Sequence, residues 1–297
     1  MTATRREVIL AGIGLGVAFA TGTSLRTLGV LPSGGGTDQT DMLQSAVDAA
    51  AGAGLPLFFP PGTYSTRRLE LRSRTHLTGV PGRSILRYRD GGGLIGIEQA
   101  NDIRLESLVL DGDGKDMGVD GALLAATMVE RLRLSNCGFL RSGSSGILVS
   151  RCEDVAITGN IVDKAATGIA VASSEQGGTA ALIQGNLVRN LFFRKVALFH
   201  GTGISIDAGA MVKGNIVEDA PGFGILVGSA GDVSVLNNRI RNAHIGIGIP
   251  AEIVTTAPVS GNSISSTRDG AIRAMRGPTP VGPDLAVDPA YQPEGSA

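Results

Sequence analysis

A short phrase, an Asn followed eight to seventeen residues later by Gly and Ile, returns six times between Asn136 and Ile272. The asparagines are Asn136, Asn160, Asn186, Asn215, Asn238 and Asn262. Successive asparagines lie 24, 26, 29, 23 and 24 residues apart, and such a near-constant period indicates stacked repeats. Each copy consists of three short strand-like segments separated by turns. The sequence therefore predicts an all-β fold, a single-stranded parallel β-helix in which each copy forms one coil.

Asparagine suits the corner of such a coil. Coils stack about 4.8 Å apart, so equivalent residues form ladders along the axis. The Asn amide carries both donors and acceptors and tolerates the left-handed backbone conformation of sharp bends. The alternative, a β-sandwich with turn asparagines, predicts Asn-Gly hairpins and irregular spacing, and the sequence has neither.

Composition limits the classes of protein. The chain has 297 residues, 44 Gly, no Trp and a net charge of -1. The near-neutral charge argues against a nucleic-acid partner, which needs a basic surface. We expect no membrane span in the mature chain, because no long apolar run follows the first segment. The two cysteines, Cys137 and Cys152, fall at different corners of the predicted coil, so we expect buried thiols rather than a disulfide.

The first twenty residues have the features of an export signal. Arg5 and Arg6 precede an uncharged run from Val8 to Ala20, which ends in the small-residue sequence Ala18-Phe19-Ala20. A buried N-terminal helix is the alternative, but three glycines in this run disfavour it. We expect residues 1–20 to be a twin-arginine signal peptide, the twin-arginine export machinery to be a partner, and the mature protein to be periplasmic or secreted.

The rest of the chain divides into three predicted parts. Residues 21–36 are expected to be a flexible lead, and residues 37–276 the parallel β-helix, with a capping helix near 40–52. Residues 277–297 form a Pro-rich polar tail, expected to be extended or disordered. The last coil then lacks an obvious lid. Either the tail covers it, or another subunit does and an oligomer forms there, or the reading frame is shortened.

Two stretches carry a resemblance to known proteins. Thr40 to Ala50 together with Pro60-Pro-Gly-Thr-Tyr64 resembles the N-terminal cap of the pectate-lyase-like right-handed β-helix superfamily. The twin-arginine start, this cap and the run from Gly201 to Ile225 are similar to the uncharacterised family of twin-arginine-translocated (TAT) repetitive proteins. The resemblance implies the fold, its right-handedness and export. The handedness also agrees with the general rule for parallel crossovers.

In that superfamily the active groove runs along the strand that corresponds to Gly-Ile. The outward positions of this strand are Leu148, Ala170, Ser205, Leu226 and Gly248, and none is charged. The carboxylate and arginine clusters of pectate lyases and the Asp pair with Gly-His-Gly of polygalacturonases are not found. This counts against those two activities.

The candidate site residues lie in turns beside that groove. The third copy carries an insertion, Leu191 to His200. We consider His200 as a general base oriented by Asp207 or Asp163. The candidate ligand-binding residues are Phe192, Phe193, Arg194, Lys195, Phe199, Glu218, Asp219, Arg241 and His244. The alternative is that the Phe side chains cover a sheet face and the charges are solvated.

An acidic stretch, Asp111-Gly-Asp113-Gly-Lys115-Asp116, begins like a calcium loop. Lys115 and Ala122 occupy places where Ca²⁺ needs oxygen ligands, so a polar loop is favoured over a Ca²⁺ site. We expect no metal site and no cofactor.

These observations predict an exported β-helix protein that binds an envelope or extracellular polysaccharide. If it is an enzyme, it modifies that polymer as a lyase, hydrolase or epimerase. The alternative is a non-catalytic structural or assembly protein. The insertion favours the first hypothesis, and the uncharged groove strand favours the second.

Overall fold

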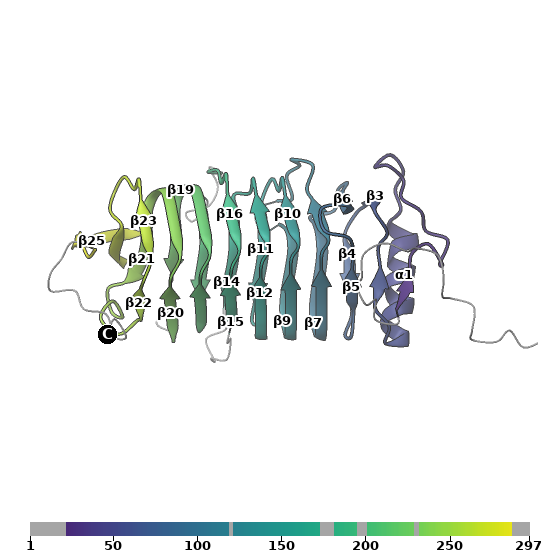
Figure 1. Cartoon of the computed structure of the whole chain (residues 1–297), viewed down its shortest axis with the longest axis horizontal. Helices are drawn as coiled ribbons and strands as arrows, with labels where there is room; N and C mark the ends of the chain where they lie inside the picture. Colours follow the sequence, from purple (N-terminus) through teal and green to yellow (C-terminus); the bar gives the residue numbers. More distant parts are fainter. Residues whose placement is uncertain (1–21, 119–120, 173–180, 195–200, 229–231, 287–297) are drawn as a thin grey trace, which may run out of the picture.

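The computed structural model describes residues 22–118, 121–172, 181–194, 201–228 and 232–286. Parallel strands stack into a long solenoid, with its N-terminal end at the right and its C-terminal end at the left of Figure 1. In the described part, no helix is long and apolar enough to cross a membrane. The single-stranded parallel β-helix predicted from the repeat is confirmed.

The strands form three sheets, one on each face of the solenoid. The first sheet comprises β1 (Thr23–Ser24), β2 (Leu57–Phe58), β5 (His76–Thr78), β12 (Glu153–Thr158), β15 (Ala181–Gln184), β18 (Ala210–Lys213), β20 (Val233–Leu236) and β22 (Val259–Ser260). The second sheet comprises β3 (Gly62–Thr66), β6 (Ser84–Tyr88), β8 (Val109–Asp111), β10 (Gly138–Leu140), β13 (Ile161–Asp163), β16 (Leu187–Arg189) and β23 (Ser263–Ser265).

The third face, named here the Gly-Ile sheet, carries the repeated Gly-Ile segments. It comprises β4 (Leu69–Leu71), β11 (Ser145–Ser150), β14 (Thr167–Ala172), β17 (Thr202–Asp207), β24 (Ile272–Arg276) and β25 (Thr279–Asp284). Four long strands run round a corner and serve two sheets: β7 (Gly93–Glu106) and β9 (Ala122–Ser135) join the Gly-Ile and first sheets, and β19 (Ile216–Val227) and β21 (Arg239–Pro250) join the second and Gly-Ile sheets. β25 pairs antiparallel with β24, whereas the other pairings between described strands are parallel.

Side chains point alternately inward and outward along each strand, so equivalent inward residues of successive coils stack in the core. Ile147, Ile169, Ile204, Ile225 and Ile247 are in register, and all five are fully buried. Such branched aliphatic side chains pack well against a pleated surface. The core is therefore built from repeated aliphatic columns.

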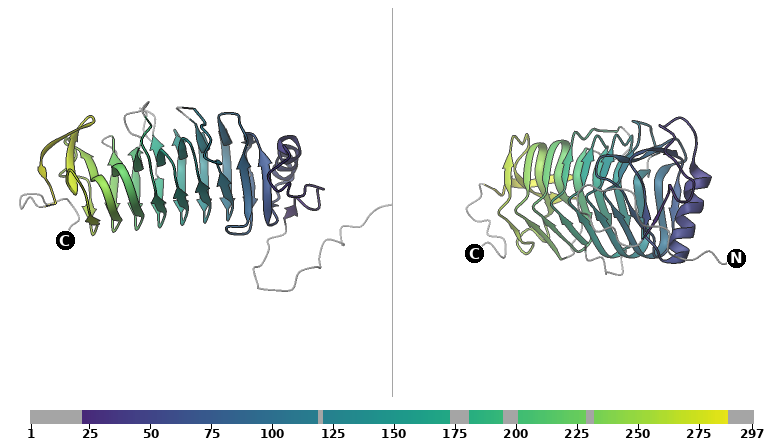
Figure 2. Two further views of the ribbon diagram at one scale, coloured as in Figure 1. Left: turned by 90° about the horizontal axis from the view of Figure 1, so that it is seen from above. Right: turned by 45° about the vertical axis from the view of Figure 1, so that its right-hand side comes forward.

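The helix α1 (Thr40–Ala53) lies across the N-terminal end of the stack, as Figures 1 and 2 show. Its apolar stripe, including Leu43 and Val47, is buried against the first coils. The helix ends at Gly54 in the left-handed conformation, with φ of 66°. The predicted capping helix is thus present and covers an otherwise open sheet end.

The asparagine ladder is present, with one correction. Asn160, Asn186, Asn215 and Asn238 are buried. The backbone N–H and the side-chain Nδ2 of each of the first three donate to Oδ1 of the Asn in the next coil. Asn136 is not in the ladder. The backbone N–H of Cys137 donates to Asn160 Oδ1 at 2.9 Å, so Cys137 occupies the ladder position.

Asn136 instead takes the position before the ladder. Its φ is 54°, and its equivalent in the next coil, Gly159, has φ of 65°. Asn tolerates this left-handed conformation better than most residues, which explains why an Asn stands in a Gly column. Both cysteines are free and buried, as expected, and burial raises the pKa of the Cys137 thiol to about 12.

The structure differs from the expectation of a flexible lead at residues 21–36. Strand β1 pairs with β2, and Leu25 and Val30 are buried in the core. The Thr23 N–H donates to the Pro56 carbonyl at 2.8 Å. This segment adds a further rung beside α1, because pairing satisfies the free edge of β2.

The structure also differs from the expectation for residues 277–297, of which 287–297 lie outside the described residues. Strand β25 folds back onto β24, and Asp284 accepts hydrogen bonds from the Ala271 and Ile272 backbones at 2.7 and 3.0 Å. Of the two covers considered for the last coil, the tail and another subunit, the tail supplies one on the Gly-Ile sheet. An oligomer formed through this end stays a prediction.

Candidate functional site

The outward face of the Gly-Ile sheet is an uncharged column over its central coils. Leu148, Ala170, Ser205, Leu226 and Gly248 are in register, as the repeat predicts. The column begins at Glu70 and ends at Arg273, beyond the central coils. Its small and apolar side chains leave a shallow floor between charged ends.

A cavity of about 400 Å³ opens over this floor, towards the carboxyl ends of the strands. Ala170, Ser205 and Leu226 line its base, and Asp207, Glu252 and Met275 line its side. Two carboxylates and one hydroxyl therefore face a largely apolar hollow. A few polar groups in a mostly apolar concave site are typical of ligand pockets.

Asp207 is the last residue of β17, and it is exposed. In the next coil the equivalent residue is Gly228, and a β-carbon built there would lie 3.4 Å from Asp207 Oδ1. The missing side chain leaves the carboxylate accessible above the next coil. Glu252 follows β21 in an exposed turn. Among the described residues, neither carboxylate has an ion-pair partner.

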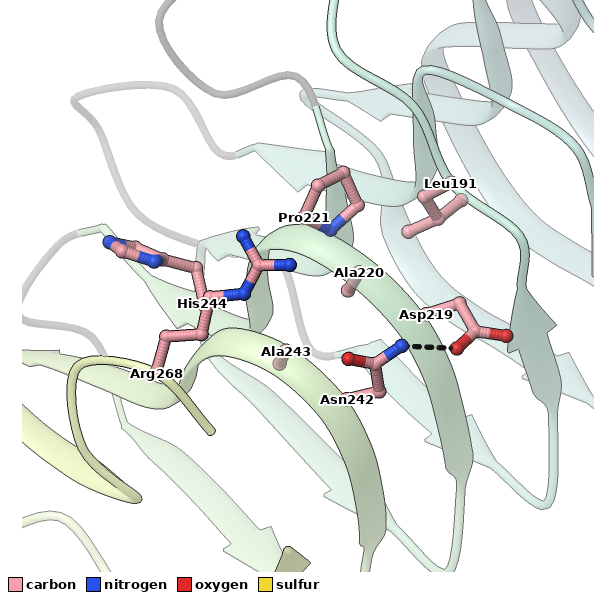
Figure 3. A pocket seen from close by; sticks show the side chains of 8 residues that line it. All are labelled: Leu191, Asp219, Ala220, Pro221, Asn242, Ala243, His244 and Arg268. Carbon is pink, nitrogen blue, oxygen red and sulfur yellow. Dashed lines mark hydrogen bonds between the residues drawn. The ribbon is translucent and has the colours of Figure 1, made fainter. Parts of the chain in front are cut away.

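A smaller hollow of about 190 Å³ lies at the opposite ends of the strands, in the turns that lead into the Gly-Ile sheet. Figure 3 shows its lining, which includes Leu191, Pro221, His244 and Arg268. Asn242 Nδ2 donates to Asp219 Oδ1 at 2.7 Å across the two coils. This hollow brings together two predicted ligand-binding residues, Asp219 and His244.

Several other candidates are bound to neighbouring coils. Asp163 accepts from Arg189 at 2.9 Å and from Asn190 at 2.8 Å. Glu218 lies 3.2 Å from Arg241. Asp163, Arg189, Glu218 and Arg241 are aligned in strands of the second sheet and alternate in charge, so their first role is to link coils. These contacts agree better with the alternative, in which the charged residues have no part in catalysis, than with a catalytic role.

The insertion contributes a contact that the sequence did not indicate. Arg194 donates to Asp116 Oδ2 at 2.8 Å, to the Gly118 carbonyl at 2.9 Å and to Ser144 Oγ at 2.7 Å. Its guanidinium is engaged with the protein, although it was a candidate for ligand binding. Phe192 and Phe193 are 36% and 62% exposed, so they remain available to a ligand.

Asp163 and Asp207, the two carboxylates considered as alternatives for orienting His200, lie apart from each other. Asp163 precedes β14, whereas Asp207 ends β17, which lies beside β14. A six-residue strand spans roughly 16 Å, so one side chain cannot contact both carboxylates. His200, Lys195 and Phe199 lie outside the described residues.

Sequence reasoning missed Glu252. Aligning the residues at the end of each Gly-Ile strand gives Ala172, Asp207, Gly228 and Pro250, with Glu252 two positions on. That alignment could have indicated that Glu252 lies near Asp207. The turn after Pro250 has no equivalent in the other coils, however, so the repeat does not place Glu252.

The acidic loop that was considered for Ca²⁺ is held by ion pairs. Asp111 contacts Arg141 and Arg87, and Asp113 lies 3.4 Å from Lys115. The pKa of Asp116 is lowered by the Gly118 N–H and also by Arg194. Carboxylates that already contact cationic groups make poor calcium ligands. No cluster of three or more His, Cys, Asp and Glu suited to a metal occurs among the described residues.

Comparison with solved structures gives the fold class. Tailspike protein 2 from Escherichia coli O157:H7 bacteriophage CAB120 is 14% identical, with a TM-score of 0.54 over 86% of this chain and 43% of that chain. The tailspike of E. coli bacteriophage HK620, in complex with a pentasaccharide, is 14% identical with a TM-score of 0.52 over 85% and 60%. The A-module of an Azotobacter vinelandii mannuronan C-5 epimerase is 17% identical with a TM-score of 0.44 over 85% and 91%.

At these identities the likeness concerns the fold. This chain spans less than two thirds of either tailspike. Comparison with curated proteins finds no match. The family described as "Rhamnogalacturonase A/epimerase, pectate lyase-like" matches residues 23–248. The superfamily resemblance is thereby confirmed, while the narrower likeness to twin-arginine-translocated repetitive proteins stays a prediction. The chain belongs to the rhamnogalacturonase A/epimerase family of pectate-lyase-like proteins.

Proposed function

We propose that this protein binds a polysaccharide along the Gly-Ile sheet, with the cavity beside Asp207 as its central subsite. The observation that carries the proposal is the cavity of about 400 Å³, whose floor is uncharged and whose side holds Asp207 and Glu252. An extended column of small side chains accommodates a chain-like ligand across several coils. Carboxylates beside it accept hydrogen bonds from sugar hydroxyls.

Among the three reactions considered, the lining supports hydrolysis. A lyase needs a base and cations to hold the charge that develops beside a uronate, and the described lining contains no Lys, Arg or His. A glycoside hydrolase needs two carboxyl groups, one as acid and one as base or nucleophile. Asp207 lies two coils, or about 10 Å along the axis, from Pro250, and Glu252 follows Pro250 by two residues. Both carboxylates line the same cavity, which is what a pair acting on one sugar requires.

Related proteins support a carbohydrate ligand. The matching family is named for a rhamnogalacturonase and an epimerase, and the HK620 tailspike was solved with a pentasaccharide. The exposed Phe192 and Phe193 lie in the insertion before β17, where they offer apolar surface to a sugar ring.

We also propose that the protein meets this ligand outside the cytoplasm. Arg5 and Arg6 before an uncharged run support twin-arginine export to the periplasm or the medium. Replacing both arginines by lysine should retain the uncleaved protein in the cytoplasm of a host with this export machinery. Unchanged export of the double variant would overturn this part of the proposal.

The binding proposal is tested by filling the cavity floor. The protein and the Ser205→Trp variant are incubated with acidic and neutral polysaccharides, and retention on the polymer and new reducing ends are measured. The control is Ser234→Trp, because Ser234 is also a half-buried outward serine but lies in the first sheet. We expect loss of retention in Ser205→Trp alone.

The products separate the remaining alternatives. New reducing ends that disappear in Asp207→Asn and in Glu252→Gln would support hydrolysis. Retention without any product would leave a binding protein. No retention on any polymer would reject the proposal and favour the structural or assembly role.

A further inference from the structure

The side of the Gly-Ile sheet that holds the large cavity is acidic over its central coils. Asp207, Asp232 and Glu252 all lie in the turns that leave this sheet, and all three are exposed. In the described residues of these turns, 207–210, 228, 232 and 251–258, there is no Lys, Arg or His. The amino-acid sequence of 173–180 and of 229–231 contains no Lys, Arg or His either.

The nearest arginines lie at the borders of this region. Arg151 follows β11, and its backbone N–H donates to the Ala172 carbonyl, so it lies two coils from Asp207. Arg276 ends β24 but does not line the cavity. Arg273 lies in the outward column, but Asp269 and the Gly282 carbonyl hold its guanidinium, each at 3.0 Å. The cavity therefore faces two carboxylates without a compensating cation in its described lining.

This imbalance bears on which polymer enters. The carboxylates of a polyuronate would lie beside Asp207 and Glu252 with no cation to separate them, and like charges so placed disfavour binding. Neutral sugars meet no such repulsion, and an ammonium group of an amino sugar would be attracted. A bridging Ca²⁺ could offset the repulsion, but the described residues offer no cluster of three ligands for it.

We infer that the cavity takes glycans without acidic groups, neutral or amine-bearing, and excludes polyuronates. The inference rests on the proposed function and narrows it to a substrate class. The exclusion follows from the charges that line this cavity.

The test compares three polymers as probes: partially deacetylated chitosan, a neutral glucan and polygalacturonate. Retention of the purified protein is measured in low and high salt, with Ca²⁺ or with a chelator. In low salt, with Ca²⁺ or with a chelator, we expect polygalacturonate to be retained at least about tenfold less than the better of the other two. Retention on chitosan, where it occurs, should weaken as salt is raised.

Charge reversal gives the second arm. The double variant Asp207→Lys with Glu252→Lys should lose retention on chitosan and gain retention on polygalacturonate. The matched control is Glu98→Lys, because Glu98 is also exposed and stands in the same column as Asp207, four coils or about 19 Å away. The control should behave as the unaltered protein.

The outcomes distinguish the two proposals. If polygalacturonate is retained best and Ser205→Trp abolishes that retention, the cavity binds glycans but the inference about charge is wrong. Retention of polygalacturonate that appears only with Ca²⁺ would also overturn the inference. If none of the three polymers is retained, the proposed function fails and the inference fails with it.

Discussion

Each buried asparagine of the ladder uses every polar atom of its side chain. Asn186 Oδ1 accepts from the backbone and side chain of Asn160 at 2.9 and 3.1 Å. Its Nδ2 donates to the Ile157 carbonyl at 2.8 Å and to Asn215 Oδ1 at 2.9 Å. One side chain thus satisfies groups in two neighbouring coils, which would otherwise be buried without partners.

Replacing Asn186 by Ala should therefore destabilise the protein far more than the loss of one turn residue would. The change leaves the Asn160 N–H buried without its acceptor, at a cost of about 1–3 kcal/mol. It also removes the bonds to Asn160 Nδ2, the Ile157 carbonyl and Asn215 Oδ1. We expect the free energy of unfolding to fall by about 3–5 kcal/mol in denaturant titrations. The control is Asn190→Ala, because Asn190 is exposed and makes one side-chain bond to Asp163. Equal losses in the two variants would contradict this account of the ladder.

Among the elements, the insertion before β17 is tied to a loop far away in sequence. Arg194, whose side chain is 17% exposed, joins Asp116 and Ser144, although 78 residues separate Arg194 from Asp116. These contacts bridge turns of coils that do not adjoin in sequence. They fix the start of the insertion rather than bind a ligand.

Removing this contact should loosen the insertion without unfolding the solenoid. We expect Arg194→Gln to be cleaved faster by proteases between residues 190 and 201, with little change in melting temperature, because the core columns are untouched. Arg241→Gln is the control, since Arg241 also pairs with one carboxylate but is 59% exposed. Mass spectrometry of the fragments locates the cleavage. Unchanged cleavage in Arg194→Gln would show that other contacts hold the insertion.

The C-terminal strand depends on one carboxylate. Burial raises the pKa of Asp284, but the N–H groups of Ile272, Ala271 and Ala286 outweigh it, so the pKa lies below its ordinary 3.8. A lowered pKa in the folded state means that the ionised group stabilises the fold above about pH 3.8. This contribution disappears as the pH falls through the lower, folded-state pKa.

Asp284→Asn should thus lower the melting temperature at neutral pH by about 2–6 °C, since three charge-assisted hydrogen bonds weaken or are lost. The difference between the variant and the unaltered protein should shrink in acid, where Asp284 is protonated. Thermal unfolding followed by circular dichroism over a range of pH measures this. A difference that persists unchanged at low pH would mean that shape, not charge, sets the effect.

At the scale of the whole molecule, the repeat predicted what recurs from coil to coil. Ile169 and Ser205 take their expected inward and outward places because strand alternation is written locally in the sequence. The correction at Asn136 arose because Asn suits both the ladder and the left-handed position before it. One residue type thus satisfies two neighbouring requirements.

Features outside the repeat were not predictable in the same way. β1 and β25 form because sheet ends leave unpaired backbone groups, and no periodic pattern marks the segments that satisfy them. The floor of the candidate site followed from the alternation. Glu252 lies in a turn without equivalents, and the Arg194 contact joins distant turns, so both needed the three-dimensional structure.

The two ends of the solenoid lead to a last prediction. At one end α1 covers the first coils, and at the other β25 covers the edge of β24, while β22 and β23 have no further neighbour among the described strands. Deleting residues 279–297 would expose the β24 edge as well. Open edges with aligned N–H and C=O groups favour pairing with another chain.

We therefore expect the deletion variant to associate as its concentration rises, measured by light scattering after size-exclusion chromatography. Deleting 287–297 alone is the matched control, because it keeps β25 and should leave the mass distribution of the unaltered protein. If removal of β25 leaves that distribution unchanged at every concentration, the β24 edge is not what limits association. The charges of the neighbouring turns would then be the feature that keeps chains apart, although the β22, β23 and β24 edges are open.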